Sequence, residues 1–262
     1  MPANLLADKV AVVTGGASGN GRAIALAFAR EGAKAVVVVD LRADPREGGR
    51  PTHELIEAET PTKSVFVNCN VTKPAEVEAA VAAADAFGGV DVMVNNAGIA
   101  MAPGSSGDLL TATEAQFDLM IGVNVKGVYF GCQAAAKRML PKGGGSIIIM
   151  SSVSGIQGDG GDAIYNTTKG AVRLMTYGLA AALGPKGIRV NAIHPGVIKT
   201  AMTTFDAPIV GGPMEQMMLG MIPMGRFGEP KEIGDAAVYL ASDMASYVNG
   251  ASLIVDGGWK RV

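Results

Sequence analysis

A glycine-rich turn between an apolar strand and an alanine-rich helix is the feature that most constrains this chain. The strand 10–13 runs through Thr14 into a turn with glycines at positions 15, 19 and 21, and a helical stretch follows. Such a turn lets a phosphate approach the main chain, where free N–H groups and the positive helix end favour negative charge. Alone, it could be only a tight connection. A second apolar strand, 36–39, ends in Asp40, and the whole unit predicts a dinucleotide site whose ribose hydroxyls bind Asp40.

Apolar runs alternate with helical stretches along the whole chain, which is typical of the α/β class. Most runs are apolar on consecutive residues, as in parallel strands that helices cover on both faces. We therefore expect a doubly wound, parallel, seven-stranded sheet. No Pro- or Ser-rich linker, charge block or repeat divides residues 1–262, so a single domain is expected. The expected strands lie near 10–13, 36–39, 64–67, 91–94, 146–150, 188–193 and 252–255, and three of the expected helices near 21–32, 113–140 and 163–183.

Composition and charge argue against several partners. The formal net charge of -2 gives no electrostatic case for binding nucleic acid or an anionic membrane. No apolar run reaches the roughly 20 residues of a membrane span, and the start lacks a signal-peptide pattern, so a cytoplasmic protein is expected. Cys69 and Cys132 lie far apart and resemble small core residues rather than a disulfide framework. His53 and His194 lack a second ligand at metal-binding spacing, so no metal site is predicted, and a structural or substrate-lining role is expected for His194.

Tyr165 and Lys169 stand one helical turn apart, and Ser152 lies thirteen residues upstream of the tyrosine, after an apolar strand. A free tyrosine has a pKa of about 10, so acid–base chemistry at neutral pH needs a fixed positive charge beside it. Lysine at i+4 supplies that charge on the same helix face. The pair alone is common on solvated helix faces, and Ser152 alone could simply bind strand-end amides. The other motifs therefore decide the interpretation.

In their order and spacing, these motifs resemble those of the short-chain dehydrogenase/reductase family over essentially the whole chain. The glycine turn matches T-G-x-x-x-G-x-G, and residues 95–98 match N-N-A-G. Residues 195–200 resemble the family's nicotinamide-side loop, and residues 256–258 its C-terminal turn. The four catalytic positions of the family match Asn124, Ser152, Tyr165 and Lys169. The resemblance implies a Rossmann fold and an NAD-dependent oxidoreductase.

The resemblance also implies a role for each catalytic position. Tyr165 exchanges a proton with the substrate oxygen while hydride moves between the carbinol carbon and the nicotinamide. Lys169 favours the tyrosine anion and hydrogen-bonds the nicotinamide ribose. Ser152 holds the substrate oxygen, and Asn124, which could otherwise only cap or kink its helix, anchors a water that links Lys169 to solvent.

Cofactor binding is expected at residues from every motif. Asp40 would repel a 2′-phosphate, and Ser18 stands where NADP-preferring relatives often carry a basic residue, so NAD is the expected cofactor. Arg42, two residues after Asp40, could nevertheless turn toward a phosphate. The expected cofactor residues are Gly15, Ser18, Gly19, Asn20, Gly21, Asp40, Asn70, Val71, Asn96, Gly98, Tyr165, Lys169, Pro195, Gly196, Ile198 and Thr200.

Three departures from the family pattern bear on the site. Asn20 replaces a usual Ile or Leu, but its contribution there is mainly a backbone N–H. Asn70 replaces a frequent Asp and keeps an acceptor for adenine in its amide oxygen. The segment 42–63 is long and broken by proline and glycine. We interpret that segment as a surface insertion without chemistry.

The substrate is expected to be a neutral secondary alcohol or ketone, apolar or cyclic. The stretch 201–224, the expected substrate lid, has only Asp206 and Glu215 as charged residues and no arginine to clamp an anion. It is rich in methionine, which adapts to irregular apolar shapes; an amphipathic helix packed on the core is the alternative. Its methionines are Met202, Met214, Met217, Met218, Met221 and Met224.

Other functions stay open. A 3-oxoacyl thioester reductase would require NADPH preference and a basic docking patch, and a sugar dehydrogenase would require a more polar lid. A non-catalytic nucleotide-binding scaffold is opposed by the intact Ser152, Tyr165 and Lys169.

A homotetramer is expected from the resemblance, because two different isologous interfaces generate a closed tetramer. The helices near 113–140 and 163–183 are more apolar than one core-facing stripe requires, with Val128, Ala134 and Leu174 among the surplus. Trp259 is expected to be buried in such a contact.

Overall fold

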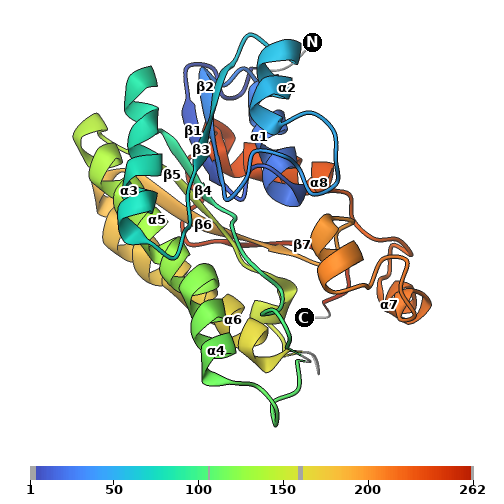
Figure 1. Cartoon of the computed structure of the whole chain (residues 1–262). Helices are drawn as coiled ribbons and strands as arrows, with labels where there is room; N and C mark the ends of the chain where they lie inside the picture. The colour runs from blue at the N-terminus through green and yellow to red at the C-terminus, as the bar shows by residue number, and fades with distance from the viewer. Residues whose placement is uncertain (1–3, 106, 159–161, 261–262) are drawn as a thin grey trace.

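A computed structural model describes residues 4–105, 107–158 and 162–260, and a parallel sheet lies at its centre (Figure 1). In this part of the chain seven strands pair in the order β3-β2-β1-β4-β5-β6-β7. Every expected strand is present, with its ends within two residues of the prediction. The strands are β1 (Val10–Thr14), β2 (Ala35–Asp40), β3 (Lys63–Asn68), β4 (Val92–Asn95), β5 (Gly145–Met150), β6 (Ile188–Pro195) and β7 (Ser252–Val255).

The sheet is buried on both faces, which explains why its strands are apolar on consecutive residues. β1 and β2 are buried at almost every position, so each strand sends side chains into two separate cores. One core lies under α3 (Pro74–Ala82), α5 (Gly127–Met139) and α6 (Ala163–Leu183). The other lies under α1 (Gly19–Arg30), α2 (Thr52–Glu59) and α8 (Pro230–Ala241). The helices of the two sets lie on opposite sides of the sheet (Figure 1). The doubly wound architecture is thus confirmed.

The expected helix near 113–140 is divided into three parts. It begins as α4 (Glu114–Ile121), passes through a π-helical turn over Gly122–Lys126, and continues as α5. Asn124 lies inside that turn, fully buried. A π-turn inserts an extra residue into the helix, and such turns are frequent at functional sites. The sequence pattern could not reveal the turn, because the apolar spacing continues through it.

The surplus apolar residues on these helices turn out to be core residues in large part. Val128 and Ala134 are buried against the sheet, so they do not supply the surplus apolar surface that the sequence indicated. Leu174 of α6 differs, because it is 71% exposed. Trp259 is half-buried and packs against a small cluster that includes Val197 and Met218.

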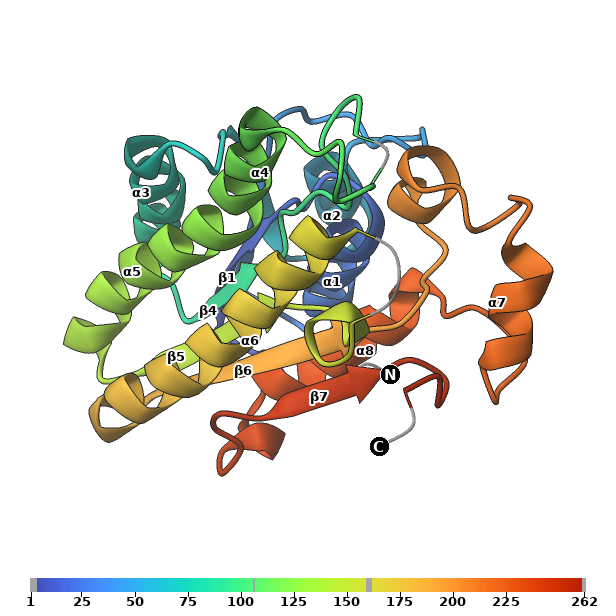
Figure 2. The ribbon, with the colours of Figure 1, turned by 90° about the horizontal axis from the view of Figure 1, so that it is seen from below.

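The segment beyond β6 extends past the sheet and carries the short helix α7 (Glu215–Met221), as Figure 2 shows. Met218 and Ile222 point into a local core with Phe227, whereas Met214, Met217 and Met224 are exposed. The packed-helix alternative holds for Met218, and the lid stays a prediction. No helix in the described ranges is long and apolar enough to cross a bilayer.

Candidate active site

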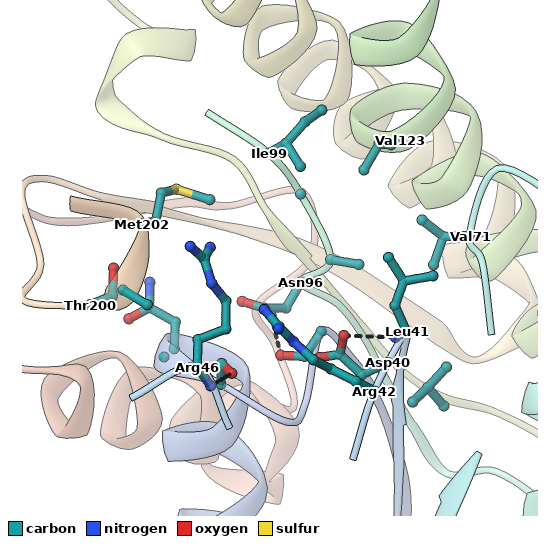
Figure 3. Close-up of a pocket in the computed structure, with 18 of the residues that line it drawn as sticks. Asp40, Leu41, Arg42, Arg46, Val71, Asn96, Ile99, Val123, Thr200 and Met202 are labelled. Atoms are coloured by element: carbon teal, nitrogen blue, oxygen red, sulfur yellow. Dashed lines mark hydrogen bonds between the residues drawn. The ribbon is translucent and has the colours of Figure 1, made fainter. Parts of the chain in front are cut away.

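A cavity of about 510 Å³ opens at the carboxyl ends of β1, β2 and β4 (Figure 3). β1 lies between β2 and β4, which is the point where the strand order reverses and where open α/β sheets bind their ligands. The volume lies within the usual range for small-molecule sites. Ten expected cofactor residues line the cavity: Gly15, Ser18, Gly19, Asn20, Asp40, Asn70, Val71, Asn96, Gly98 and Thr200.

The glycine turn is packed so tightly that two of its glycines cannot be replaced without moving the backbone. A Cβ atom on Gly21 would lie 2.0 Å from the carbonyl oxygen of Gly15, and one on Gly15 would lie 2.7 Å from Nδ2 of Asn96. Asn96 holds the turn from below by donating to the carbonyls of Thr14, at 3.0 Å, and Gly15, at 3.2 Å.

The turn fits a dinucleotide phosphate on the chain's own geometry. Gly19 and Asn20 line the cavity at the amino end of α1, where the first main-chain N–H groups of a helix have no acceptor within the helix. Oδ1 of Asn20 is buried without a hydrogen-bond partner among the described residues. A turn with main-chain groups at the cavity and a buried Asn20 oxygen that is unpaired among the described residues is suited to binding an additional polar ligand.

Asp40 ends β2 beside the turn and is already bound to it. Its carboxylate accepts from the N–H of Ala17 at 3.1 Å and from that of Leu41 at 2.7 Å. Burial raises the pKa of Asp40, although both N–H groups and the charges of Arg42 and Arg46 act in the opposite direction. Asp40 therefore lies at the cavity wall with two guanidinium groups nearby (Figure 3).

The segment 42–63 does take part in the site, so the interpretation of it as a surface insertion without chemistry is wrong. The N–H of Arg46 donates to Oγ of Ser18 at 2.8 Å, and Glu47 accepts from the N–H of Gly19 at 2.8 Å. The Arg46 side chain lines the cavity and forms an ion pair with Asp206 of the expected lid. The strap, as we call residues 42–51, thus connects the glycine turn to the lid.

The same segment also supports the turn from behind. Thr52, the first residue of α2, is fully buried and donates to the carbonyl of Ala17 at 3.2 Å. Arg22 in turn donates to the Thr52 hydroxyl at 2.9 Å. Proline and glycine break the sequence here because the chain must cross the turn before α2 can begin.

Lys169 is the charged side chain buried at the centre of the candidate site. It is 5% exposed, its Nζ donates to the carbonyl of Met150 at 3.0 Å, and the same atom lies 5.6 Å from the ring centroid of Tyr165. Burial lowers the pKa of Lys169 to about 8. Tyr165 stands on the first turn of α6, where Asp162 caps the helix by accepting from Ile164 and Tyr165.

Asn124 and Gly98 come together with Lys169. A Cβ on Gly98 would lie 3.2 Å from Oδ1 of Asn124 and 3.4 Å from Nζ of Lys169. Asn124 accepts from the N–H of Ile99 at 2.9 Å, and its Nδ2 donates to the Ile99 carbonyl and to the Thr168 hydroxyl. Both amide hydrogens are used, so the side chain holds the strand end against α6.

Ser152 is held at the end of β5 by contacts on its main chain and its hydroxyl. Its Oγ accepts from the N–H of Ser154 at 3.1 Å. The neighbouring Ser151 donates to the carbonyl of Lys169 at 2.9 Å, and a Cβ on Gly155 would lie 2.6 Å from that carbonyl. The loop that carries Ser152 is therefore clamped to α6 at the turn that carries Lys169.

The loop after β6 passes beside the glycine turn. Gly196 is packed against Asp256, since a Cβ there would lie 2.8 Å from the Cβ of Asp256. Ile198 is buried, and Thr200 lies next to Gly19, with 3.3 Å from its Cβ to a Cβ built on that glycine. Pro195 ends β6. The structure places these residues between the glycine turn and the lid, although Pro195, Gly196 and Ile198 do not line the cavity.

Asn70 and Val71 lie on the other side of the cavity, after β3. Oδ1 of Asn70 accepts from both the N–H and the hydroxyl of Thr72, at 3.0 and 2.8 Å. Its amide oxygen therefore stabilises a local turn, a role that the sequence interpretation did not include. Val71 lines the cavity and packs against Gly127 of α5.

Several lining residues were missed by sequence reasoning. Val39, Leu41, Cys69 and Val123 are apolar residues next to motif residues, and their types gave no signal. Arg46 could have been found, because an arginine near the end of β2 reaches the same sheet edge. In the described parts of the chain, no three His, Cys, Asp or Glu side chains gather as a metal site.

Known proteins are similar to this chain over nearly its whole length. A family model described as enoyl-(acyl carrier protein) reductase matches residues 15–260. The 2-(R)-hydroxypropyl-CoM dehydrogenase of Xanthobacter autotrophicus is 38% identical over 97% of this chain and 100% of its own length. The L-rhamnose 1-dehydrogenase (NAD(P)(+)) of Azotobacter vinelandii is 41% identical over 97% of both chains.

A third relative, the 3-alpha-(or 20-beta)-hydroxysteroid dehydrogenase of Mycobacterium bovis, is 42% identical over 97% of this chain and 90% of its own length. Among solved structures, a short-chain type dehydrogenase/reductase from Mycobacterium marinum superposes with a TM-score of 0.88 at 32% identity. It covers 98% of this chain and 97% of its own. These similarities extend over both the cavity and the four candidate catalytic positions.

Proposed function

Because this chain belongs to the short-chain dehydrogenase/reductase family, we propose that it interconverts a secondary alcohol and a ketone with NAD(H) as cofactor. Oxidoreductase chemistry follows from the relatives, which are dehydrogenases. The observation that carries the proposal is the buried Lys169, whose ammonium lies beside the Tyr165 ring and the Gly98 end of the cavity.

The cofactor, when bound, supplies the hydride acceptor or donor. The chain's own residues supply the proton chemistry. Tyr165 takes the hydroxyl proton in oxidation and returns it in reduction, and the charge of Lys169 favours the phenolate. Ser152 holds the substrate oxygen by donating its hydroxyl proton, since its Oγ already accepts from the N–H of Ser154. Proton transfer of this kind is typically worth about 10²–10⁴-fold in rate.

Asn124 acts differently from the simple expectation. Both hydrogens of its amide are engaged with Ile99 and Thr168, so they do not bind a water. We assign the water contact to the main-chain carbonyl of Asn124 at the π-helical turn, where helical bonding is irregular. The side chain then fixes Gly98 and α6 relative to each other.

NAD is the proposed cofactor rather than NADP. The half-buried carboxylate of Asp40 stands at the cavity wall and would repel a 2′-phosphate while accepting from ribose hydroxyls. Arg42 and Arg46 act against this preference, but Arg46 is paired with Asp206. Comparison of kcat/KM for the two cofactors tests the assignment, and equal values would refute it. Asp40→Ala should reduce the preference for NAD.

A neutral, apolar or cyclic substrate is proposed. The lid presents exposed Phe205, Met214 and Met217, and methionine adapts to bulky apolar shapes. The hydroxysteroid relative at 42% identity favours this class. A sugar substrate is the second candidate because of the rhamnose relative. A 3-oxoacyl thioester reductase is the third candidate; the family model's description shares its thioester substrate class but names reduction of an enoyl group rather than of a ketone.

A homotetramer is proposed as the working form. Phe117 of α4, Tyr129 of α5 and Leu174 of α6 are 42%, 47% and 71% exposed on neighbouring helices. Burying such side chains against a second copy would remove apolar surface from water. These three residues replace the buried ones as the basis for the interface.

The experiment for the proposed function is a panel of secondary alcohols and ketones assayed with NAD(H) and NADP(H), followed by the absorbance of the reduced nicotinamide. Steroid-like and alicyclic alcohols should be turned over with higher kcat/KM than sugars or 3-oxoacyl thioesters. A preference for charged or polar substrates would reject the apolar class, and no turnover with any substrate would favour the non-catalytic alternative.

A further inference from the structure

His194, near the end of β6, is fully buried and uses both of its ring nitrogens. Nδ1 lies 2.9 Å from the main-chain carbonyl oxygen of Ser152, and Nε2 lies 3.0 Å from the hydroxyl of Ser252 on β7. The same Ser152 carbonyl also accepts from the N–H of Gly155 at 3.0 Å. The imidazole therefore contacts the backbone of the residue that is proposed to hold the substrate.

The hydrogen bonds continue away from the site. The Ser252 hydroxyl lies 2.8 Å from the hydroxyl of Tyr177 on α6, and Nε of Arg173, one turn earlier on that helix, donates to the Tyr177 hydroxyl at 3.0 Å. The guanidinium also lies over the Tyr177 ring, 5.8 Å from its centroid. Arg173, Tyr177, Ser252 and His194 thus form a chain that ends at Ser152.

The chemistry of its histidine end fixes the protons in this chain. A carbonyl oxygen can only accept, so Nδ1 of His194 must carry the proton, and a neutral ring then leaves Nε2 as an acceptor. Ser252 must therefore donate to Nε2 and accept from Tyr177. At the other end a guanidinium can only donate, so the Tyr177 oxygen accepts from Arg173. That contact leaves the Tyr177 proton available for Ser252, so the arginine end is compatible with the direction that the histidine end sets.

We propose that His194 is a positioning residue, held as the neutral Nδ1–H tautomer by this chain, and that it fixes the Ser152 backbone relative to α6. The proposal rests on the proposed function in one respect only, namely that Ser152 contacts the substrate. α6 carries Tyr165 and Lys169 as well as Arg173 and Tyr177. The chain therefore connects the serine to the helix that carries the other catalytic side chains, by way of β6 and β7.

The surroundings of His194 oppose a second proton on the ring. Burial lowers its pKa, and the charges of Arg173 and Lys169 on α6 and of Lys260 in the C-terminal segment act in the same direction, against the Ser152 carbonyl contact, which raises it. Protonation at Nε2 would make the ring a donor toward Ser252, and the Ser252 hydroxyl proton would lose Nε2 as its acceptor. The ring should consequently not act as an acid or base in the reaction.

The tautomer is tested directly by NMR of protein labelled with ¹⁵N in the histidine rings. His194 and His53 are the two histidines of the chain, so His53→Gln assigns the signals. The neutral Nδ1–H form should persist from about pH 8 to below the ordinary histidine pKa of about 6.5. An Nε2–H tautomer, or a charged ring at pH 7, would overturn the proposal. This measurement needs no substrate, so it stands even if the proposed function fails.

A matched pair of variants tests the positioning role. In His194→Asn the amide nitrogen can take the place of Nδ1 and donate to the Ser152 carbonyl. In His194→Leu the side chain still fills the space of the ring, but the donor is removed. The kcat of the Leu variant should be about tenfold or more below that of the wild type, because a small displacement of a reacting group lowers the rate strongly. The Asn variant should retain most of the wild-type kcat. The dissociation constant for NADH should change little in either. Equal kcat values in the two variants would refute the role.

Discussion

Replacing Lys169 by methionine should abolish turnover and yet make the folded protein more stable at neutral pH. Lys169 is 5% exposed, and burial lowers its pKa from 10.5 to about 8. A folded-state pKa below the unfolded value means that the unfolded chain binds the proton more tightly, so charging this lysine costs stability below about pH 8. Each pKa unit corresponds to about 1.4 kcal/mol, which gives a cost of about 3 kcal/mol at pH 7.

Part of that gain is offset in the variant. Methionine cannot donate to the Met150 carbonyl, which Lys169 contacts at 3.0 Å, and a lost hydrogen bond costs about 1 kcal/mol. The net stabilisation at pH 7 should then be about 2 kcal/mol. As the pH rises through about 8 toward 10.5, the wild type loses its buried charge and becomes more stable relative to the variant. The advantage of Lys169→Met should therefore shrink by about 2 to 3 kcal/mol between pH 7 and pH 10.

Urea unfolding at fixed protein concentration, followed by circular dichroism at pH 7 and pH 10, measures this difference. Other titrating groups are common to both proteins and cancel in the comparison. The same exchange at Lys126, which is exposed on the π-helical turn, controls for the added methionine. A Lys169→Met protein that is less stable than wild type at pH 7, or a difference that does not change with pH, would refute the reasoning.

Three further results are expected. Gly21→Ala should weaken NADH binding by more than about tenfold in a fluorescence titration, because the new Cβ would lie 2.0 Å from the Gly15 carbonyl oxygen. The control is Gly220→Ala, which should bind NADH normally because nothing lies within 4 Å of its Cβ. Arg46→Ala should speed NADH release in stopped-flow measurements, because it frees the lid from the strap. The loss of folding stability should stay below about 1 kcal/mol, since the ion pair with Asp206 is partly exposed. An unchanged release rate would reject the idea that this ion pair holds the lid to the strap. Light scattering at micromolar concentration should give four times the 26.7 kDa chain mass, and a monomer would refute the tetramer.

The fold followed from the sequence because its signals are local and repeated. Runs such as 36–39 are apolar on every residue, which only a strand covered on both faces requires. The right-handed crossover rule then brings the ends of β1, β2 and β4 to one edge. Asp40 and Asn96 could be placed in one site for that reason, although they lie far apart in the chain.

What the sequence could not supply depends on contacts between distant segments. The local sequence does not indicate that Arg46 pairs with Asp206. It also does not indicate that Thr52 hydrogen-bonds the carbonyl of Ala17. The π-turn at Asn124 changes which groups of that residue are used without changing the apolar pattern. The partners of His194 come from the loop after β5 and from β7, and were not visible for the same reason.

The central claim is that Tyr165 transfers the substrate proton, and Tyr165→Phe tests it most directly. The exchange removes one oxygen and leaves Lys169 and the cavity in place. The initial rate of change of the nicotinamide absorbance, with the best alcohol of the panel, should fall by about 10²-fold or more, while NADH binds with an unchanged dissociation constant. Residual turnover above about one tenth of the wild-type rate, with binding intact, would contradict the assignment.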